Sequence, residues 1–142
     1  GRVKVKLAVI TPDKGSHLVQ APDGHDLEHW IERVVGARKV GWEVSKDLMV
    51  WTDYMDASSG RPTNRLATSL LPHRELAVNG VAVVTGRIEG RAQSLNRGQI
   101  TRLGLDPEGL ARSAILDEVL ISLGAPAVTG FFDAPHETDP RP

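Results

Sequence analysis

Two histidines four residues apart, His25 and His29, are the residues of this 142-residue sequence whose spacing could hold a metal ion. In a helix they fall on one face with Glu28 and Glu32, because each residue advances about 100° around the axis. Imidazole and carboxylate ligands at this spacing suit zinc or nickel. A metal centre needs a third converging ligand, which the sequence does not indicate. We therefore favour a solvated helix face and predict no metal and no other cofactor.

Four arginines, Arg87, Arg91, Arg97 and Arg102, are the best candidates for a nucleic-acid-binding face. The single acid in their stretch is Glu89, and no aromatic residue there is available to stack on bases. The whole chain has 17 basic and 18 acidic residues, for a net charge of -1. Nucleic-acid binders usually carry a basic excess, because neutralising phosphates drives their affinity. Nucleic-acid binding is therefore the alternative hypothesis.

Motifs for covalent or nucleotide chemistry are missing from the sequence. It contains no cysteine, which removes thiol nucleophiles, thiolate zinc sites and disulfides. Neither Gly-x-Ser-x-Gly nor Ser-x-x-Lys occurs, and neither a P-loop nor a dinucleotide fingerprint is present. We expect a protein that is not an enzyme, with small-ligand or nucleotide binding as a further alternative.

The elements that would position these residues begin with strands. Residues 3–9 alternate apolar and polar side chains, which predicts a half-buried strand, and residues 17–21 close a hairpin with it through a turn at 13–15. Residues 40–44 alternate in the same way, and the β-rich segment 48–54 follows a short turn. We predict a second hairpin there.

The clearest helix covers residues 27–35, where apolar residues recur at helical spacing around Trp30. Asp23 or Asp26 is the expected N-cap, and Gly36 is the expected stop. Trp30 is predicted to anchor this amphipathic helix in the core.

In the middle of the chain, the sequence predicts a central strand and a short helix. A β-branched run within residues 78–88 is bounded by Gly80 and Gly86, which we interpret as strand-end and turn positions. Ser94 is predicted to cap a helix that ends at Leu103. Residues 66–71 form either one helical turn or an extended segment.

A second C-terminal helix is predicted to start at Asp106-Pro107-Glu108 and to end at Gly124. Its apolar residues cover more than one stripe, so it is either packed under the tail or shared with a partner. Residues 125–142 are Pro-rich and predict an extended tail. The candidate partner-binding residues are Leu116, Leu120, Leu123, Phe131 and Phe132.

These elements predict an α+β fold: a mostly antiparallel sheet, one amphipathic helix after the first strands, and two C-terminal helices. We expect one domain over residues 1–124, followed by the tail.

Four short segments resemble a known family: Val5-Lys6-Leu7-Ala8-Val9-Ile10, the helix ending Val34-Val35-Gly36, Pro62-Thr63-Asn64-Arg65-Leu66-Ala67, and Val78-Asn79-Gly80-Val81-Ala82-Val83-Val84. Over roughly residues 3–103 the chain resembles the domain-of-unknown-function family numbered 3846, small proteins common in phages, plasmids and conjugative elements. It departs from that pattern after Gly36, where a second glycine is expected. The resemblance implies a mobile-element origin and no known reaction.

Asn64 is the polar position that the resemblance singles out. Asparagine readily bonds neighbouring backbone groups, so we expect a buried side chain that fixes a loop.

The first hypothesis is an accessory protein of a phage or mobile element that acts through protein–protein interaction, with host modulation or defence evasion fitting that origin. We expect a protein partner or self-association. No stretch of the sequence approaches the roughly 20 apolar residues of a membrane span, so we expect no membrane partner and a cytoplasmic location in a bacterial host.

Overall fold

The computed structural model describes residues 5–13, 15–21, 26–36, 38–54, 60–72 and 77–109. Both predicted hairpins are confirmed, but the first strand, predicted to be half-buried, is buried on both faces. Strand β1 (Val5–Thr11) pairs antiparallel with β2 (Gly15–Ala21), and β3 (Lys39–Ser45) pairs antiparallel with β4 (Leu48–Asp53).

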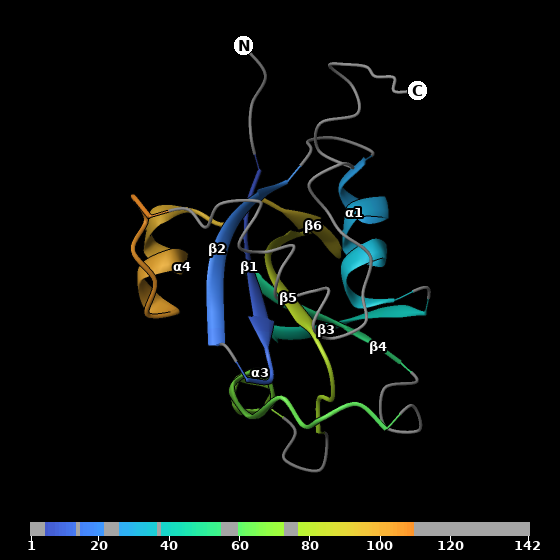
Figure 1. The fold of residues 1–142 in the computed structure, drawn as a ribbon. Helices are drawn as coiled ribbons and strands as arrows, with labels where there is room; N and C mark the ends of the chain where they lie inside the picture. The colour runs from blue at the N-terminus through green and yellow to red at the C-terminus, as the bar shows by residue number, and fades with distance from the viewer. Residues whose placement is uncertain are drawn as a thin grey trace, which may run out of the picture.

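The predicted central strand is β5 (Ala82–Ile88), which joins the two hairpins into one sheet of order β2-β1-β5-β4-β3 (Figure 1). Val83 lies opposite Val9 of β1, and Val84 lies opposite Val50 of β4. Both valines are fully buried, as expected for a strand covered on both faces. Every described pairing is antiparallel, so the predicted α+β class is confirmed.

Helix α1 (Asp26–Val35) packs its apolar stripe on one face of the sheet. Trp30 is fully buried there, which confirms it as a core anchor. Asp26 is the first residue of the helix, and Asp23 lies outside the described residues. Gly36 follows the helix with φ of 137°, and a Cβ at this position would lie 2.2 Å from an oxygen of Asp53. The positive φ favours glycine at the helix stop, and a side chain there would also have to displace the Asp53 carboxylate.

The opposite face of the sheet is covered by α3 (Arg65–Leu70) and α4 (Arg97–Arg102). Ala67 of α3 and Ile100 of α4 are buried in one cluster with Val50 and Val84. Of the two alternatives for residues 66–71, the helical one is therefore correct.

The predicted cap of the α4 helix is wrong. Asn96 is the N-cap: its side chain accepts from the backbone N–H of Gln99, and the Gln99 side chain accepts from the Asn96 N–H. The Ser94 hydroxyl instead accepts from the Lys6 backbone N–H at 2.9 Å. A contact with a strand 88 positions away in sequence, which local spacing does not reveal, therefore moved the helix start by two residues.

The turn position expected at Gly86 is also wrong. Gly86 lies inside β5, paired with Leu48 and with Gln93 of the short strand β6 (Arg91–Gln93), which was not predicted. A Cβ on Gly86 would lie 2.7 Å from the Ser94 carbonyl oxygen. Glycine is thus needed here for close backbone approach.

From residue 110 onward the second predicted C-terminal helix lies outside the described residues, and so do the candidate residues Leu116, Leu120, Leu123, Phe131 and Phe132. At its expected start, the Asp106 carboxylate accepts from the Glu108 N–H at 3.0 Å. The boundary at residue 124 and the tail remain predictions.

Asn64 is fully buried and ties three segments together. Its amide nitrogen donates to the Ile10 carbonyl at 2.9 Å and to the Gly80 carbonyl at 2.8 Å. Its amide oxygen accepts from the Ala67 N–H at 3.1 Å, which makes Asn64 the N-cap of α3. This side chain therefore fixes the loop before α3 against β1 and against the segment leading into β5.

Replacing Asn64 with Ala is expected to lower the free energy of unfolding by about 3 kcal/mol, because two buried carbonyls lose their donor and α3 loses its cap. Asn96→Ala is the matched control, since Asn96 caps α4 but is exposed, and there we expect a loss of about 1 kcal/mol. Urea unfolding measures both. Equal losses in the two variants would contradict the special role of Asn64.

Candidate functional site

A groove of about 300 Å³ lies along the end of β3, between this strand and the Leu71–Pro72 segment that follows α3. Its apolar lining consists of Trp42, Val44, Leu71 and Pro72. The remaining lining residues are the polar ones that alternate along the strand and enter its turn, namely Glu43, Ser45 and Lys46. The groove thus has a mixed lining, with apolar and polar side chains from β3 beside the Leu71–Pro72 segment.

Among the described strands, β3 is the last one on its side of the sheet, which leaves its border beside the groove. Trp42 and Val44 point to the face covered by α3 and α4, but both side chains are only half-buried. The indole N–H of Trp42 donates to the Thr52 hydroxyl at 3.0 Å, which fixes the ring on β4. The pairing register shifts between Glu43 and Ser45, so a bulge lies beside the groove.

The turn after β3 is held by Asp47 from several directions. Its carboxylate accepts from the Ser45 hydroxyl at 2.8 Å and from the Arg102 guanidinium at 3.1 Å. Its backbone carbonyl accepts from the Gln99 amide at 2.8 Å and from the Arg87 N–H at 3.0 Å. These contacts fix the end of β3 on β5 and α4.

The same contacts lower the pKa of the Asp47 carboxyl from 3.8 to about 2, because the Ser45 hydroxyl, the Gln99 amide and Arg102 favour the charged form. Asp47 is therefore ionised throughout the physiological pH range.

Most of the candidate nucleic-acid-binding arginines have partners within the fold. Arg102 pairs with Asp47, Arg97 pairs with Glu108, and Arg87 donates to the Lys46 carbonyl and lies 3.7 Å from Glu43. Arg91 is exposed on β6. The structure thus places three of the four arginines near acids that the local sequence did not reveal.

The structure describes one of the two candidate metal-binding histidines. His29 lies on the exposed side of α1, whereas His25 is outside the described residues. Within the part of the chain that is described, no group of three or more His, Cys, Asp or Glu side chains could hold a metal ion.

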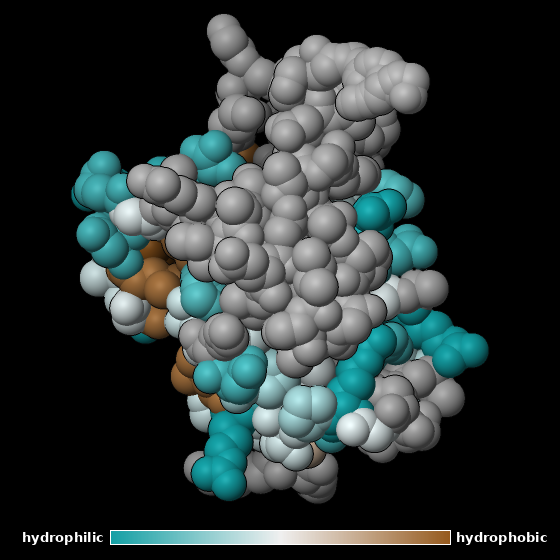
Figure 2. All heavy atoms as spheres, viewed as in Figure 1, coloured by the Kyte–Doolittle hydropathy of each residue, from teal (hydrophilic) through white to brown (hydrophobic). Residues whose placement is uncertain are grey.

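Further apolar surface lies beside α4. Leu103 and Leu105 are half-buried against the same core cluster as Trp42 and Val44. Figure 2 shows hydrophobic surface in brown on the α4 side of the molecule. None of the described helices is long and apolar enough to cross a membrane.

Comparisons with protein-family models, with curated proteins and with solved structures found no match to this chain. The resemblance to family 3846 therefore rests on the motif residues alone.

The sequence alone did not predict the groove, because its two walls, residues 42–46 and 71–72, are far apart in the sequence. The available signal was Trp42, a large apolar residue in a strand that also carries Lys39 and Glu43. That strand composition is common at sheet edges.

The pKa of Asp47 offers a direct test of the turn. A carboxyl with a lowered pKa stabilises the fold above its unfolded pKa, and this stabilisation is lost as the pH falls through the folded value. We expect Asp47→Asn to lower the urea midpoint above pH 3.8, and the difference from the original protein to shrink as the pH falls toward 2 and to vanish below it.

The variant Ser45→Ala removes the hydroxyl that contributes most to the lowered pKa of Asp47. Loss of the hydroxyl donor should raise the pKa of Asp47 toward 3.8, as followed by NMR titration of the carboxyl carbon. An unchanged titration midpoint in this variant would show that the Ser45 hydrogen bond does not stabilise the charged form.

Proposed function

We propose that this chain is a non-enzymatic accessory protein of a phage or mobile element that acts by binding a protein chain along β3. The observation that supports the proposal is the groove beside β3, the outermost of the described strands on its side of the sheet, with Trp42 half-buried in its wall. Tryptophan residues at partly exposed apolar sites are frequent hot spots of protein interfaces.

The lining of the groove favours a protein over a small ligand. Small-ligand sites combine an enclosing pocket with a few convergent polar groups. Here the Trp42 N–H donates to Thr52 and the Ser45 hydroxyl donates to Asp47. These donors are engaged inside the fold, and the groove offers Trp42 and Val44 together with polar residues along an edge strand.

The nucleic-acid alternative receives less support. A basic face binds phosphates when its cations are available, but Arg97 and Arg102 each have a carboxylate partner. Arg87 also contacts the β3–β4 turn. A role for these arginines in fixing α4 and the turn accounts for their clustering.

The mobile-element origin is proposed from the four family-like segments. Several of their distinctive residues carry backbone constraints, such as Gly36 after α1 and Asn64 before α3. Such positions specify a fold, which is why the resemblance supports an origin and a cytoplasmic bacterial setting but names no partner.

Site-specific photo-crosslinking in bacteria tests the proposed surface. A photoreactive phenylalanine analogue in place of Val44, in the groove, is expected to give discrete crosslinked products at the mass of the chain plus one partner. The same analogue in place of Leu66 is the control, because Leu66 is 45% exposed on α3 and does not line the groove.

The Val44 product should disappear when Trp42→Ala is added, provided that the thermal melt still shows a folded protein. Identical products from both positions, or no product from Val44, would refute binding along β3.

A further inference from the structure

The outer border of β3 presents backbone groups that its pairing with β4 does not use. The Tyr54 N–H donates to the Arg38 carbonyl at 3.0 Å, and the register continues from Lys39 opposite Asp53 to Glu43 opposite Met49. In an antiparallel pair, residues that bond to the neighbouring strand alternate with residues that face away. Hence Lys39, Gly41 and Glu43 direct their N–H and C=O groups outward.

No other described strand pairs with β3 on that side. Unpaired strand edges bind extended chains, because an added strand satisfies their donors and acceptors.

The side chains of residues 39–43 are arranged symmetrically about Gly41, with charges of opposite sign at the two ends. Lys39 and Glu43 lie on the α1 face, where Lys39 contacts Glu28 at 3.1 Å and the Glu43 side chain is 57% exposed. Val40 and Trp42 lie on the other face. Gly41 stands at the centre, with one charged and one apolar residue on each side.

We propose that β3 pairs antiparallel with β3 of a second copy of this chain, centred on Gly41. This inference rests on the proposed protein-binding function and names its partner. Lys39 then lies opposite Glu43 of the second copy, Gly41 opposite Gly41, and Glu43 opposite Lys39. Each of these pairs exchanges two backbone hydrogen bonds, because all their backbone groups face outward.

Side chains directly opposite one another add to this pairing. Opposite charges across two strands are favourable, and the twofold symmetry of the dimer repeats each Lys39–Glu43 pair. On the other face, Val40 meets Trp42 of the second copy at a non-hydrogen-bonded position, where side chains approach more closely. Aromatic and β-branched residues are a favourable cross-strand combination.

Competing arrangements lack this complementarity. A parallel arrangement in the same alignment sets Lys39 beside Lys39 and Glu43 beside Glu43, and like charges across strands are destabilising. If one strand is shifted by a single residue, its outward-facing backbone groups lie opposite inward-facing groups of the other strand and cannot bond to them. The complementary side chains then lie on opposite faces of the sheet. The charge pattern therefore selects one register.

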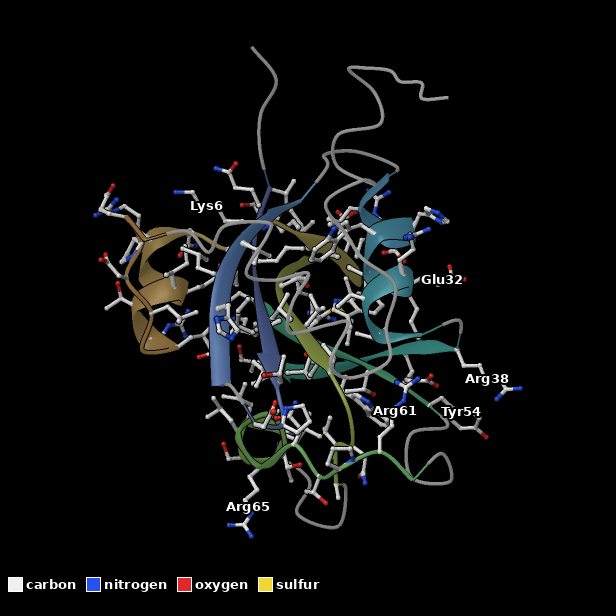
Figure 3. The ribbon with its side chains drawn as sticks, in the orientation of Figure 1. Lys6, Glu32, Arg38, Tyr54, Arg61 and Arg65 are labelled. Atoms are coloured by element: carbon white, nitrogen blue, oxygen red, sulfur yellow. The ribbon has the colours of Figure 1, made fainter. Side chains whose placement is uncertain are left out.

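In this register, the second copy also lies beside the groove. Val44 of the groove directly follows Glu43 at the bulge, and Arg38 of the second copy directly precedes the Lys39 that pairs with this Glu43. Arg38 is exposed, and Figure 3 shows its side chain and that of Tyr54 extending outward from the end of the β3–β4 hairpin. The edge and the groove thus form one continuous binding surface.

A charge-swap experiment tests this pairing. In Lys39→Glu every cross-strand pair becomes two acids, and in Glu43→Lys every pair becomes two bases. Analytical ultracentrifugation should show a concentration-dependent dimer for the original protein and a dissociation constant raised about tenfold or more in each single variant.

Mixing the two single variants should restore dimers that contain one chain of each, since all their pairs are then opposite in sign. The double variant in one chain should also recover the original affinity. Arg91→Glu, a charge reversal on β6 away from β3, is the control and should leave the dissociation constant unchanged. Because Lys39 and Glu43 also contact Glu28 and Arg87, urea unfolding is measured for each variant.

A monomer at every concentration up to about 1 mM, or single variants that dimerise as well as the original, would overturn self-pairing through β3. Mixed variants that stay monomeric would also overturn it. If the original protein is monomeric while the Val44 probe captures a different protein, self-pairing fails and the proposed function survives. If the Val44 probe captures nothing, the proposed function fails as well.

Discussion

The buried amide of Asn64 is the interaction on which the shape of the β3 surface depends. It holds the start of α3 against the Ile10 carbonyl of β1 and the Gly80 carbonyl before β5. Leu71 and Pro72 directly follow α3, so the same amide sets where one wall of the groove stands. A buried side chain with all of these partners allows little freedom, because each lost bond leaves a buried carbonyl without a donor. A polar core residue thereby determines the shape of a groove at the surface.

The other wall depends on charges that the fold holds together. Asp47 joins the β3–β4 turn to α4 through Arg102, while Arg87 contacts the same turn from β5. Individually, exposed ion pairs contribute little to stability. Their geometric effect is larger here, because they fix the end of an edge strand whose one neighbour among the described strands is β4. The basic stretch that indicated nucleic acid in the sequence thus supports the strand surface in the structure.

Local patterns predicted the elements well where one signal dominated. The alternation in β1 and β3, the β-rich composition of β4 and the stripe around Trp30 each had a single interpretation, and all four elements formed. Prediction failed where tertiary contacts chose between equal local signals, as when Lys6 engaged Ser94 and left Asn96 to cap α4. The groove was beyond local reasoning, because nothing near Trp42 indicates that Leu71 lies across from it. The position of β3 at the border of the sheet follows from strand order, which periodicity does not encode.

Edge strands usually carry charges that discourage other strands from pairing with them. On β3 the two charges are opposite in sign and equally distant from Gly41, so they oppose most incoming strands and complement an antiparallel copy of themselves. The bulge after Glu43 ends the regular edge beyond the last charged residue, which limits pairing to the self-complementary segment. A strand protected in this way against general aggregation is therefore still suited to one defined partner. The same five residues that make β3 an acceptable edge also specify which chain completes it.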